Sequence, residues 1–224
     1  MQRLTHILVT ALGSLALGTA ASAATIAEYN FDGDSFASQV TAGGVTTSSL
    51  SNGAGVPLTT VSQGNPAPSL EFSFGTVGAN LAASIADDDY YSFTITPAGT
   101  QVTFNQFDFD FFKTSNAGAN VQAVLFYDTG TYSTSTHTQL GIGQLTGTGD
   151  SGSFVPRSIS LASMPVNFTT PVEFRLYIHD SNASNQANVF RLDNLVLDAT
   201  VVPEPSAGLL ALLAMPLLAR RRRK

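Results

Sequence analysis

The chain contains no cysteine and no tryptophan among its 224 residues, and only 12% of its residues are charged. The lack of cysteine excludes a disulfide framework, thiol catalysis and any Cys-ligated zinc or iron–sulfur site. Basic residues are scarce in the body of the chain: between Glu28 and Asp198, four cations face 15 carboxylates, a net charge of −11. A body this acidic repels phosphate backbones, so nucleic acid is excluded as a partner.

The first 23 residues have the features of a secretory signal peptide. Arg3 precedes an apolar run from Ile7 to Leu17, and the small-residue site Ala21-Ser22-Ala23 follows it. Signal peptidase recognises this order of basic start, apolar segment and A-x-A site. The pattern predicts export, with cleavage between Ala23 and Ala24 and a mature chain that begins at Ala24.

Residues 201–224 form a second targeting segment. An apolar stretch runs from Ala207 to Ala219, and the chain ends in the cations Arg220, Arg221, Arg222, Arg223 and Lys224. These 13 residues, at 1.5 Å each, span about 20 Å, which is less than the roughly 30 Å of a bilayer core, so the predicted transmembrane helix is short. The terminal cations are expected to stay cytoplasmic, which places the rest of the chain across the membrane. Both ends therefore predict the same orientation.

The tail resembles a known sorting signal. The motif Pro203, Glu204, Pro205, the apolar helix and the Arg-rich end are similar to the PEP-CTERM signal of exported proteins from Gram-negative bacteria that make extracellular polysaccharide. The resemblance implies that an exosortase, a membrane transpeptidase, recognises the motif, and that Arg220, Arg221, Arg222 and Arg223 stop transfer. It implies passage through the inner membrane, anchoring by the tail before processing, and a final place in the cell envelope, at the cell surface or in the extracellular matrix.

The body, residues 24–200, has the pattern of one antiparallel β-sandwich. Its apolar residues come in short runs separated by Gly, Asn, Ser, Thr and Pro, without a helical period of useful length. Nine strands are predicted, at Thr25–Phe31, Ser69–Phe74, Tyr90–Thr96, Gln101–Phe112, Val121–Tyr127, Thr138–Leu145, Phe154–Leu161, Val172–His179 and Val189–Thr200. The stretch Ala37–Pro68 is either a surface loop or a set of weak edge strands.

Two strand patterns show alternation, and a third breaks it. Apolar Val172, Phe174, Leu176 and Ile178 alternate with polar residues, as do Phe107, Phe109 and Phe111 with Asp108 and Asp110. Such alternation is typical of antiparallel strands with one face in water. In the last strand the apolar positions change from even to odd numbers at Asp193-Asn194, which predicts a β-bulge there.

The first and last predicted strands resemble those of jelly-roll carbohydrate-binding modules. The segments that carry the resemblance are Ala27–Asp34 and Phe190–Leu197. It implies a jelly-roll-like sandwich and a structural calcium shared by the two strands. The matching carboxylates are Glu28 and Asp193, with Asp32 or Asp34 as a further ligand.

Sugar binding needs aromatic rings beside polar groups. The candidate rings are Tyr90, Tyr91, Tyr127, Tyr132 and Tyr177. Alternation places Glu173, Arg175, Tyr177 and His179 on one face of a strand, the predicted site for a polysaccharide.

Three functions remain open. The first is a non-catalytic protein of the cell surface or matrix that binds polysaccharide. The second is a secreted glycan hydrolase or lyase that uses paired carboxylates such as Asp108 and Asp110, which lie about 7 Å apart on one strand face. The third is a structural or adhesive matrix protein in which hydroxyl-rich stretches such as Ser133–Thr136 form a solvated surface. The first is the prediction adopted, and it assigns no catalytic residue.

Overall fold

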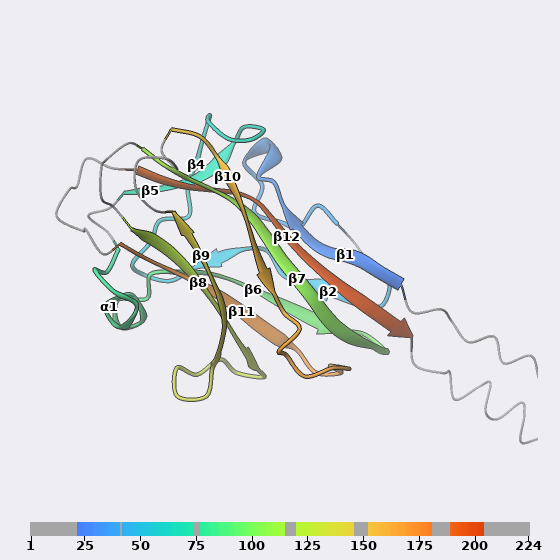
Figure 1. The fold of residues 1–224 in the computed structure, drawn as a ribbon. Coiled ribbons are helices and arrows are strands. Elements are labelled where there is room, and N and C mark those ends of the chain that lie inside the picture. The colour runs from blue at the N-terminus through green and yellow to red at the C-terminus, as the bar shows by residue number, and fades with distance from the viewer. Residues whose placement is uncertain are drawn as a thin grey trace, which may run out of the picture. The chain divides into compact units, whose positions relative to one another are not determined.

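The computed structural model describes residues 22–40, 42–73, 77–114, 120–145, 152–180 and 189–203. Its strands form two antiparallel sheets that face each other as a sandwich (Figure 1). Runs rich in β-branched and aromatic residues, interrupted by turn-forming residues, favour strands over helices. The predicted all-β, antiparallel β-sandwich is confirmed.

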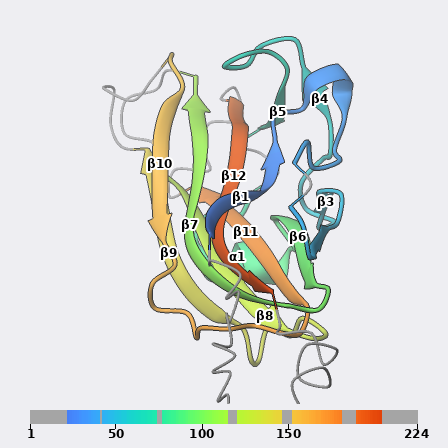
Figure 2. The ribbon, with the colours of Figure 1, turned by 90° about the vertical axis from the view of Figure 1, so that its right-hand side faces the viewer.

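The first sheet, sheet A, has the strand order β10-β7-β12-β5-β4, and β1 also pairs with β12. Its strands are β1 (Ser22–Tyr29), β4 (Thr60–Val61), β5 (Ser69–Ser73), β7 (Thr100–Lys113), β10 (Val155–Ser160) and β12 (Val189–Pro203). The last strand in the sequence, β12, is thus an inner strand of sheet A, paired with β7, β5 and β1 (Figure 2).

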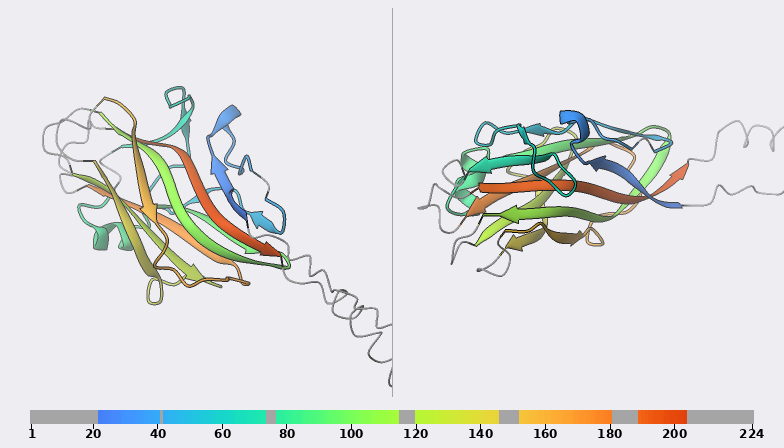
Figure 3. Two further views of the ribbon diagram at one scale, coloured as in Figure 1. Left: turned by 45° about the vertical axis from the view of Figure 1, so that its right-hand side comes forward. Right: turned by 90° about the horizontal axis from the view of Figure 1, so that it is seen from above.

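The second sheet, sheet B, has the order β2-β6-β11-β8-β9, and β3 also pairs with β6. Its strands are β2 (Val45–Thr47), β3 (Ser51–Asn52), β6 (Tyr90–Pro97), β8 (Val121–Thr129), β9 (Thr138–Leu145) and β11 (Val172–Asp180). All nine strands predicted from the sequence are present within a few residues of their predicted bounds. Figure 3 shows the sandwich from two further directions.

Phenylalanine rings fill much of the space between the sheets. Phe93 of sheet B stacks on Phe107 of sheet A with ring centroids 5.9 Å apart, and on its neighbour Phe174 at 5.3 Å. Each buried ring of this size stabilises the fold by about 1.5–3 kcal/mol. The alternation predicted for β7 and β11 places Phe107 and Phe174 inside, as observed.

The predicted bulge in β12 is present. The register between β12 and β7 shifts between Asp193 and Val196, so that two residues of β12 lie opposite one residue of β7. Asn194 has a φ of 48°, in the left-handed region that Asn tolerates better than most residues. Its side-chain amide donates to Oδ2 of Asp110 at 2.9 Å, which ties the bulge to β7.

The stretch from Ala37 to Pro68 contains short strands rather than only a loop. Strands β2 and β3 pair with β6, and β4 pairs with β5. Two short helical turns, η1 (Asp32–Asp34) and α1 (Leu81–Ala86), were not predicted. Helix α1 is only six residues long, too short to give a helical period in the sequence, and Asn80 caps it by accepting a hydrogen bond from Ala83 N.

The two ends of the sandwich domain lie side by side. Ser22 in β1 pairs with Val201 in β12, and Pro203 lies opposite Thr100 of β7. Ala23 and Ala24, the residues on either side of the predicted signal-peptidase cut, are both in β1. The residues before Ser22 and after Pro203, with Ala21, Glu204, Pro205 and the cations Arg220, Arg221, Arg222 and Arg223, lie outside the described residues. Among the described residues, no helix is long and apolar enough to cross a membrane.

Candidate functional site

Charged and aromatic side chains gather on the outer face of sheet B around Arg175 of β11. From Val172 to Leu176 the burial of β11 alternates, and Glu173 and Arg175 are its half-buried residues. Their neighbours in the sheet are β6 on one side and β8 on the other. This strand pairing brings the start of β6 and the loop after β8 close to Arg175.

Arg175 lies between two tyrosine rings. Its guanidinium carbon is 4.1 Å from the ring centroid of Tyr90 and 3.8 Å from that of Tyr132. Its Nε donates to Oε1 of Glu173 at 2.8 Å, and the two side chains are 17% and 22% exposed. Burial raises the pKa of both tyrosine hydroxyls, so the rings stay neutral at physiological pH. We call Tyr90, Tyr132, Glu173 and Arg175 the Arg175 cluster.

The loop between β8 and β9 holds Tyr132 in place. The carboxylate of Asp128 accepts hydrogen bonds from Thr129 N at 2.7 Å, Ser133 N at 3.0 Å and Thr136 Oγ1 at 2.7 Å. The pKa of Asp128 lies below its usual value, chiefly because of the hydrogen bond from Thr136 and also because of those from the two amides. The hydroxyl of Tyr132 bonds Nδ1 of His137 at 2.8 Å. The loop is therefore organised around one ionised carboxylate.

Two members of the predicted polysaccharide face are buried, which corrects that prediction. Tyr177 is fully buried beneath the cluster, 5.2 Å from Tyr90 and 5.6 Å from Phe126 between ring centroids. His179 is 8% exposed, on the part of β11 that packs against α1. Neither side chain reaches the surface, because aromatic residues and α1 cover the outer face of sheet B there.

The other tyrosines predicted as sugar-binding rings are likewise either in the core or in the Arg175 cluster. Tyr91 is 1% exposed and lies in the core, and Tyr127 packs against the core from a half-buried position. Tyr90 and Tyr132 are the two that join Glu173 and Arg175. His137 was not a predicted site residue, and no periodic pattern marks it, because its position comes from a turn and not from a strand.

A similar arrangement lies on the outer face of sheet A. The guanidinium of Arg191 is 4.7 Å from the ring centroid of Phe112, and its Nη2 is 2.7 Å from Oε2 of Glu71. Arg191 lies over one ring, whereas Arg175 lies between two. The chain thus supplies its own matched control for the Arg175 cluster.

The structure does not gather the four predicted calcium ligands into one site. Glu28 lies in β1, Asp34 accepts from Thr60 Oγ1, and Asp32 accepts from the amide of Asn30. The buried carboxylate of Asp193 accepts from two backbone amides. No three Asp, Glu or His side chains of the described residues lie close enough together to hold a metal ion. The calcium site stays a prediction.

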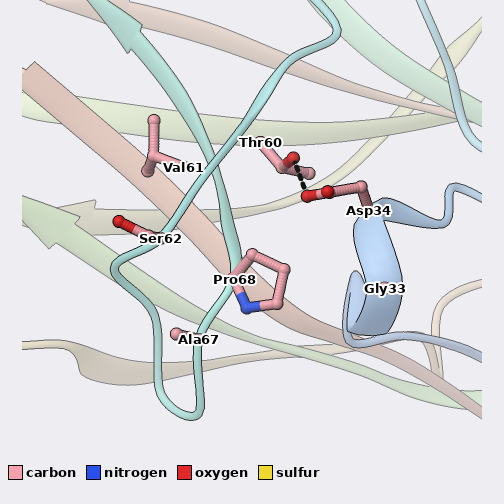
Figure 4. A pocket seen from close by; sticks show the side chains of 7 residues that line it. All are labelled: Gly33, Asp34, Thr60, Val61, Ser62, Ala67 and Pro68. Carbon is pink, nitrogen blue, oxygen red and sulfur yellow. Dashed lines mark hydrogen bonds between the residues drawn. The ribbon is translucent and has the colours of Figure 1, made fainter.

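An open cleft lies between η1 and the turn from β4 to β5 (Figure 4). The hydrogen bond between Thr60 and Asp34 crosses it. The residues that line it are Gly33, Asp34, Thr60, Val61, Ser62, Ala67 and Pro68. No aromatic ring is among them, so the cleft offers no platform on which a sugar stacks.

No protein-family model matches the chain, and no curated protein matches it. Solved structures with a similar arrangement of strands include a family 16 carbohydrate-binding module, with 17% identity over 62% of this chain and 83% of the module, and a TM-score of 0.36. Another is the family 11 carbohydrate-binding module from Clostridium thermocellum, with 14% identity over 78% of this chain and 96% of the module, and a TM-score of 0.34. A third is the CBM22-1–GH10 part of a Clostridium thermocellum xylanase, with 9% identity, 78% of this chain and 28% of that one covered, and a TM-score of 0.38. Similarity at this level says nothing about a ligand.

Proposed function

We propose that this chain is an exported, non-catalytic protein of the cell surface. In this proposal its C-terminal tail directs its sorting, and it binds polysaccharide at the Arg175 cluster. The observation that carries the binding proposal is the stack of Arg175 between Tyr90 and Tyr132 with Glu173 at its edge. The proposal for export and sorting is supported by the sequences of the two chain ends.

The chemistry of the cluster suits a neutral sugar. A pyranose ring has an apolar face that packs on an aromatic ring, and hydroxyls that both donate and accept hydrogen bonds. Tyr132 is half-buried and supplies the aromatic surface. Glu173 supplies an acceptor and Arg175 supplies donors, while their ion pair keeps the local charge near zero. The net charge of −11 on the body opposes polyanionic glycans.

Export and sorting rest on the residues quoted above for the signal peptide and the tail. In this proposal signal peptidase removes residues 1–23, the tail holds the chain in the inner membrane, and an exosortase acts at or near Pro203, Glu204 and Pro205. The final location is the cell surface or the polysaccharide matrix. Intact-mass measurement of the mature protein from its producing cell tests this part: a chain that keeps Arg220–Lys224 in the presence of an exosortase overturns it.

Binding is tested by thermal unfolding of the mature protein against a panel of polysaccharides, including that of the producing cell. A ligand that binds only the native state raises the melting temperature by mass action. We expect a saturable shift with one neutral glycan, lost in Tyr132→Ala and Arg175→Ala and kept in the matched variant Arg191→Ala. No shift with any glycan, or equal loss in Arg191→Ala, contradicts the site. Release of new reducing ends indicates the hydrolase or lyase instead.

A further inference from the structure

Four loops meet at the end of the sandwich where β1 begins and β12 finishes. They are residues 42–44, 98–99, 130–137 and 161–171. Ala98 N bonds Gly44 O at 2.8 Å, and Gly130 N bonds Pro171 O at 3.2 Å. Phe168 bridges to Val102, two residues from the pairing partner of Pro203. Figure 2 shows the loops after β6, β8 and β10 at the end where β12 finishes.

None of these four loops contains an Asp, Glu, Lys or Arg. They consist mainly of Ser, Thr, Gly, Ala and Pro, and they expose Val166, which is 66% accessible. Asp128, two residues before the loop 130–137, points into that loop, where three hydrogen bonds hold it. Burial lowers the pKa of His137, which favours the neutral ring. We call this face the uncharged end.

Exposed aspartates lie where β1 ends and β6 begins, on the side of these strands away from the uncharged end; we call this side the acidic end. Asp32 and Asp34 follow the last residue of β1, and Asp87 and Asp88 precede the first residue of β6; all four are exposed. Tyr29 pairs with Leu195, eight residues before Pro203, and β6 has eight residues, so at about 3.3 Å per residue these aspartates lie about 25 Å from the uncharged end. The exposed aspartates thus lie away from the end at which β1 starts and β12 finishes.

Little chain separates the uncharged end from the apolar tail. Pro203 is the last residue of β12, and the apolar stretch begins at Ala207. Four residue steps of at most about 3.6 Å each limit the distance between them to about 14 Å. If residues 207–219 lie in a membrane, the uncharged end is the part of the sandwich that this short connection keeps near the lipid surface.

We propose that the uncharged end rests against the surface of a phospholipid bilayer, with the acidic end directed away from it. This inference depends on the tail anchor in the proposed function. An anionic lipid surface repels carboxylates over about a Debye length, roughly 8–10 Å, so the exposed aspartates disfavour any arrangement that brings the acidic end to the membrane. The hydroxyl-rich loops carry no such penalty, and Val166 meets the interface. The outer faces of both sheets stay accessible, and Tyr132 of the Arg175 cluster lies in a loop at the border of the contact.

The absence of cysteine makes the orientation directly measurable with single-cysteine variants of the full chain. Val166→Cys and Thr134→Cys report on the uncharged end, and Ser62→Cys and Asp88→Cys on the acidic end. Each labelled chain is placed in vesicles of three parts phosphatidylcholine to one part phosphatidylglycerol that carry a headgroup quencher. We expect labels at the uncharged end to lose more than half of their fluorescence and those at the acidic end to keep it.

Flotation with the vesicles separates the two proposals. A chain that floats but is quenched equally at both ends lies flat, which overturns the orientation and leaves the anchor intact. A chain that does not float overturns the anchor and the orientation together. Quenching that appears only in native membranes indicates a protein partner and overturns the lipid contact. Val166→Asp should weaken quenching at Thr134→Cys in the anionic vesicles but not in pure phosphatidylcholine, and the matched variant Ser62→Asp should leave it unchanged.

Discussion

Arg175 and Arg191 occupy similar positions on the outer faces of opposite sheets, each paired with a glutamate and lying over an aromatic ring. They differ in one respect: Arg175 lies between Tyr90 and Tyr132, and Arg191 lies over Phe112 alone. Both ion pairs have contacts of 2.7–2.8 Å. The difference between the two sites is therefore mainly one ring contact.

Replacing each arginine with alanine should reveal that ring contact as a difference in stability. A cation on an aromatic ring contributes about 0.5–1 kcal/mol, and a partly exposed ion pair contributes up to about 1 kcal/mol. We expect Arg175→Ala to lower the free energy of unfolding by about 1–3 kcal/mol and Arg191→Ala by about 0.5–2 kcal/mol, with the loss for Arg175→Ala larger by about 0.5–1 kcal/mol, measured by urea unfolding. Equal losses, or a larger loss for Arg191→Ala, would show that Tyr132 does not stabilise the stack.

Asp128 should determine the conformation of the loop that carries Tyr132. Replacing it with alanine removes one acceptor for three hydrogen bonds, which should cost about 1–3 kcal/mol of stability. We expect Asp128→Ala to release Tyr132 from Arg175 and change the near-ultraviolet circular dichroism, which tyrosine dominates in a chain without tryptophan. Asp128→Asn keeps one acceptor and should have a smaller effect.

Asp128 also makes the stability of the folded protein depend on pH, with a sign that follows from its pKa. The pKa of Asp128 is lower in the folded protein than its usual value, chiefly because of the Thr136 bond. Its contribution to stability is therefore present above the ordinary aspartate pKa of about 3.9 and lost as the pH falls through the lower folded value. The tyrosine signal of the wild-type loop should then approach that of Asp128→Ala only in strong acid. Because His137 lies beside Tyr132 in both proteins, they are compared at each pH, and a difference between them that vanishes near pH 6 contradicts this assignment.

Asp193 should make the stability change with pH in the direction opposite to that of Asp128. Burial raises the pKa of its carboxyl to about 6, and the nearby Asp110 and Asp32 add to the effect. The folded protein therefore holds the proton more tightly than the unfolded chain does. The stabilisation is complete below about pH 4 and is lost as the pH rises through 6. Between pH 4 and 7 this group should lower the free energy of unfolding by about 2–3 kcal/mol.

A variant isolates that contribution from those of other groups. Asp193→Asn does not titrate, while His137 and His179, whose pKa values burial lowers, remain in both proteins and change stability with the opposite sign. Urea unfolding of the two proteins from pH 4 to 7 gives the difference in slope. Parallel curves would mean that Asp193 has an ordinary pKa despite its burial.

The sequence predicts the sandwich well because strand signals are local. The alternation of Phe107, Phe109 and Phe111 with aspartates follows from the two-residue period of a strand, and the phase change at Asp193-Asn194 marks a bulge for the same reason. These patterns need no knowledge of which strands are neighbours.

The site was only half predictable, because its members come from different strands. Alternation identifies the face that carries Glu173 and Arg175, yet it gives no information about what covers that face. The alternation of β11 places Tyr177 on the outer face of the sheet, together with Glu173 and Arg175. It is nevertheless buried, because Phe126, Tyr90 and Tyr132 lie over it. Long-range packing of this kind has no signal in a single strand.

Asn194 offers a test of the bulge that separates backbone strain from hydrogen bonding. Its φ of 48° costs a residue with a Cβ about 1–2 kcal/mol relative to the usual region, and glycine avoids that cost. Asn194→Ala and Asn194→Gly both remove the side-chain bond to Asp110, so their difference reports the backbone alone. We expect both variants to be less stable than the wild type in urea unfolding, with glycine about 1 kcal/mol more stable than alanine. If alanine were the more stable of the two, the left-handed conformation at the bulge would be wrong, and with it the register that places Asp193 opposite Asp110.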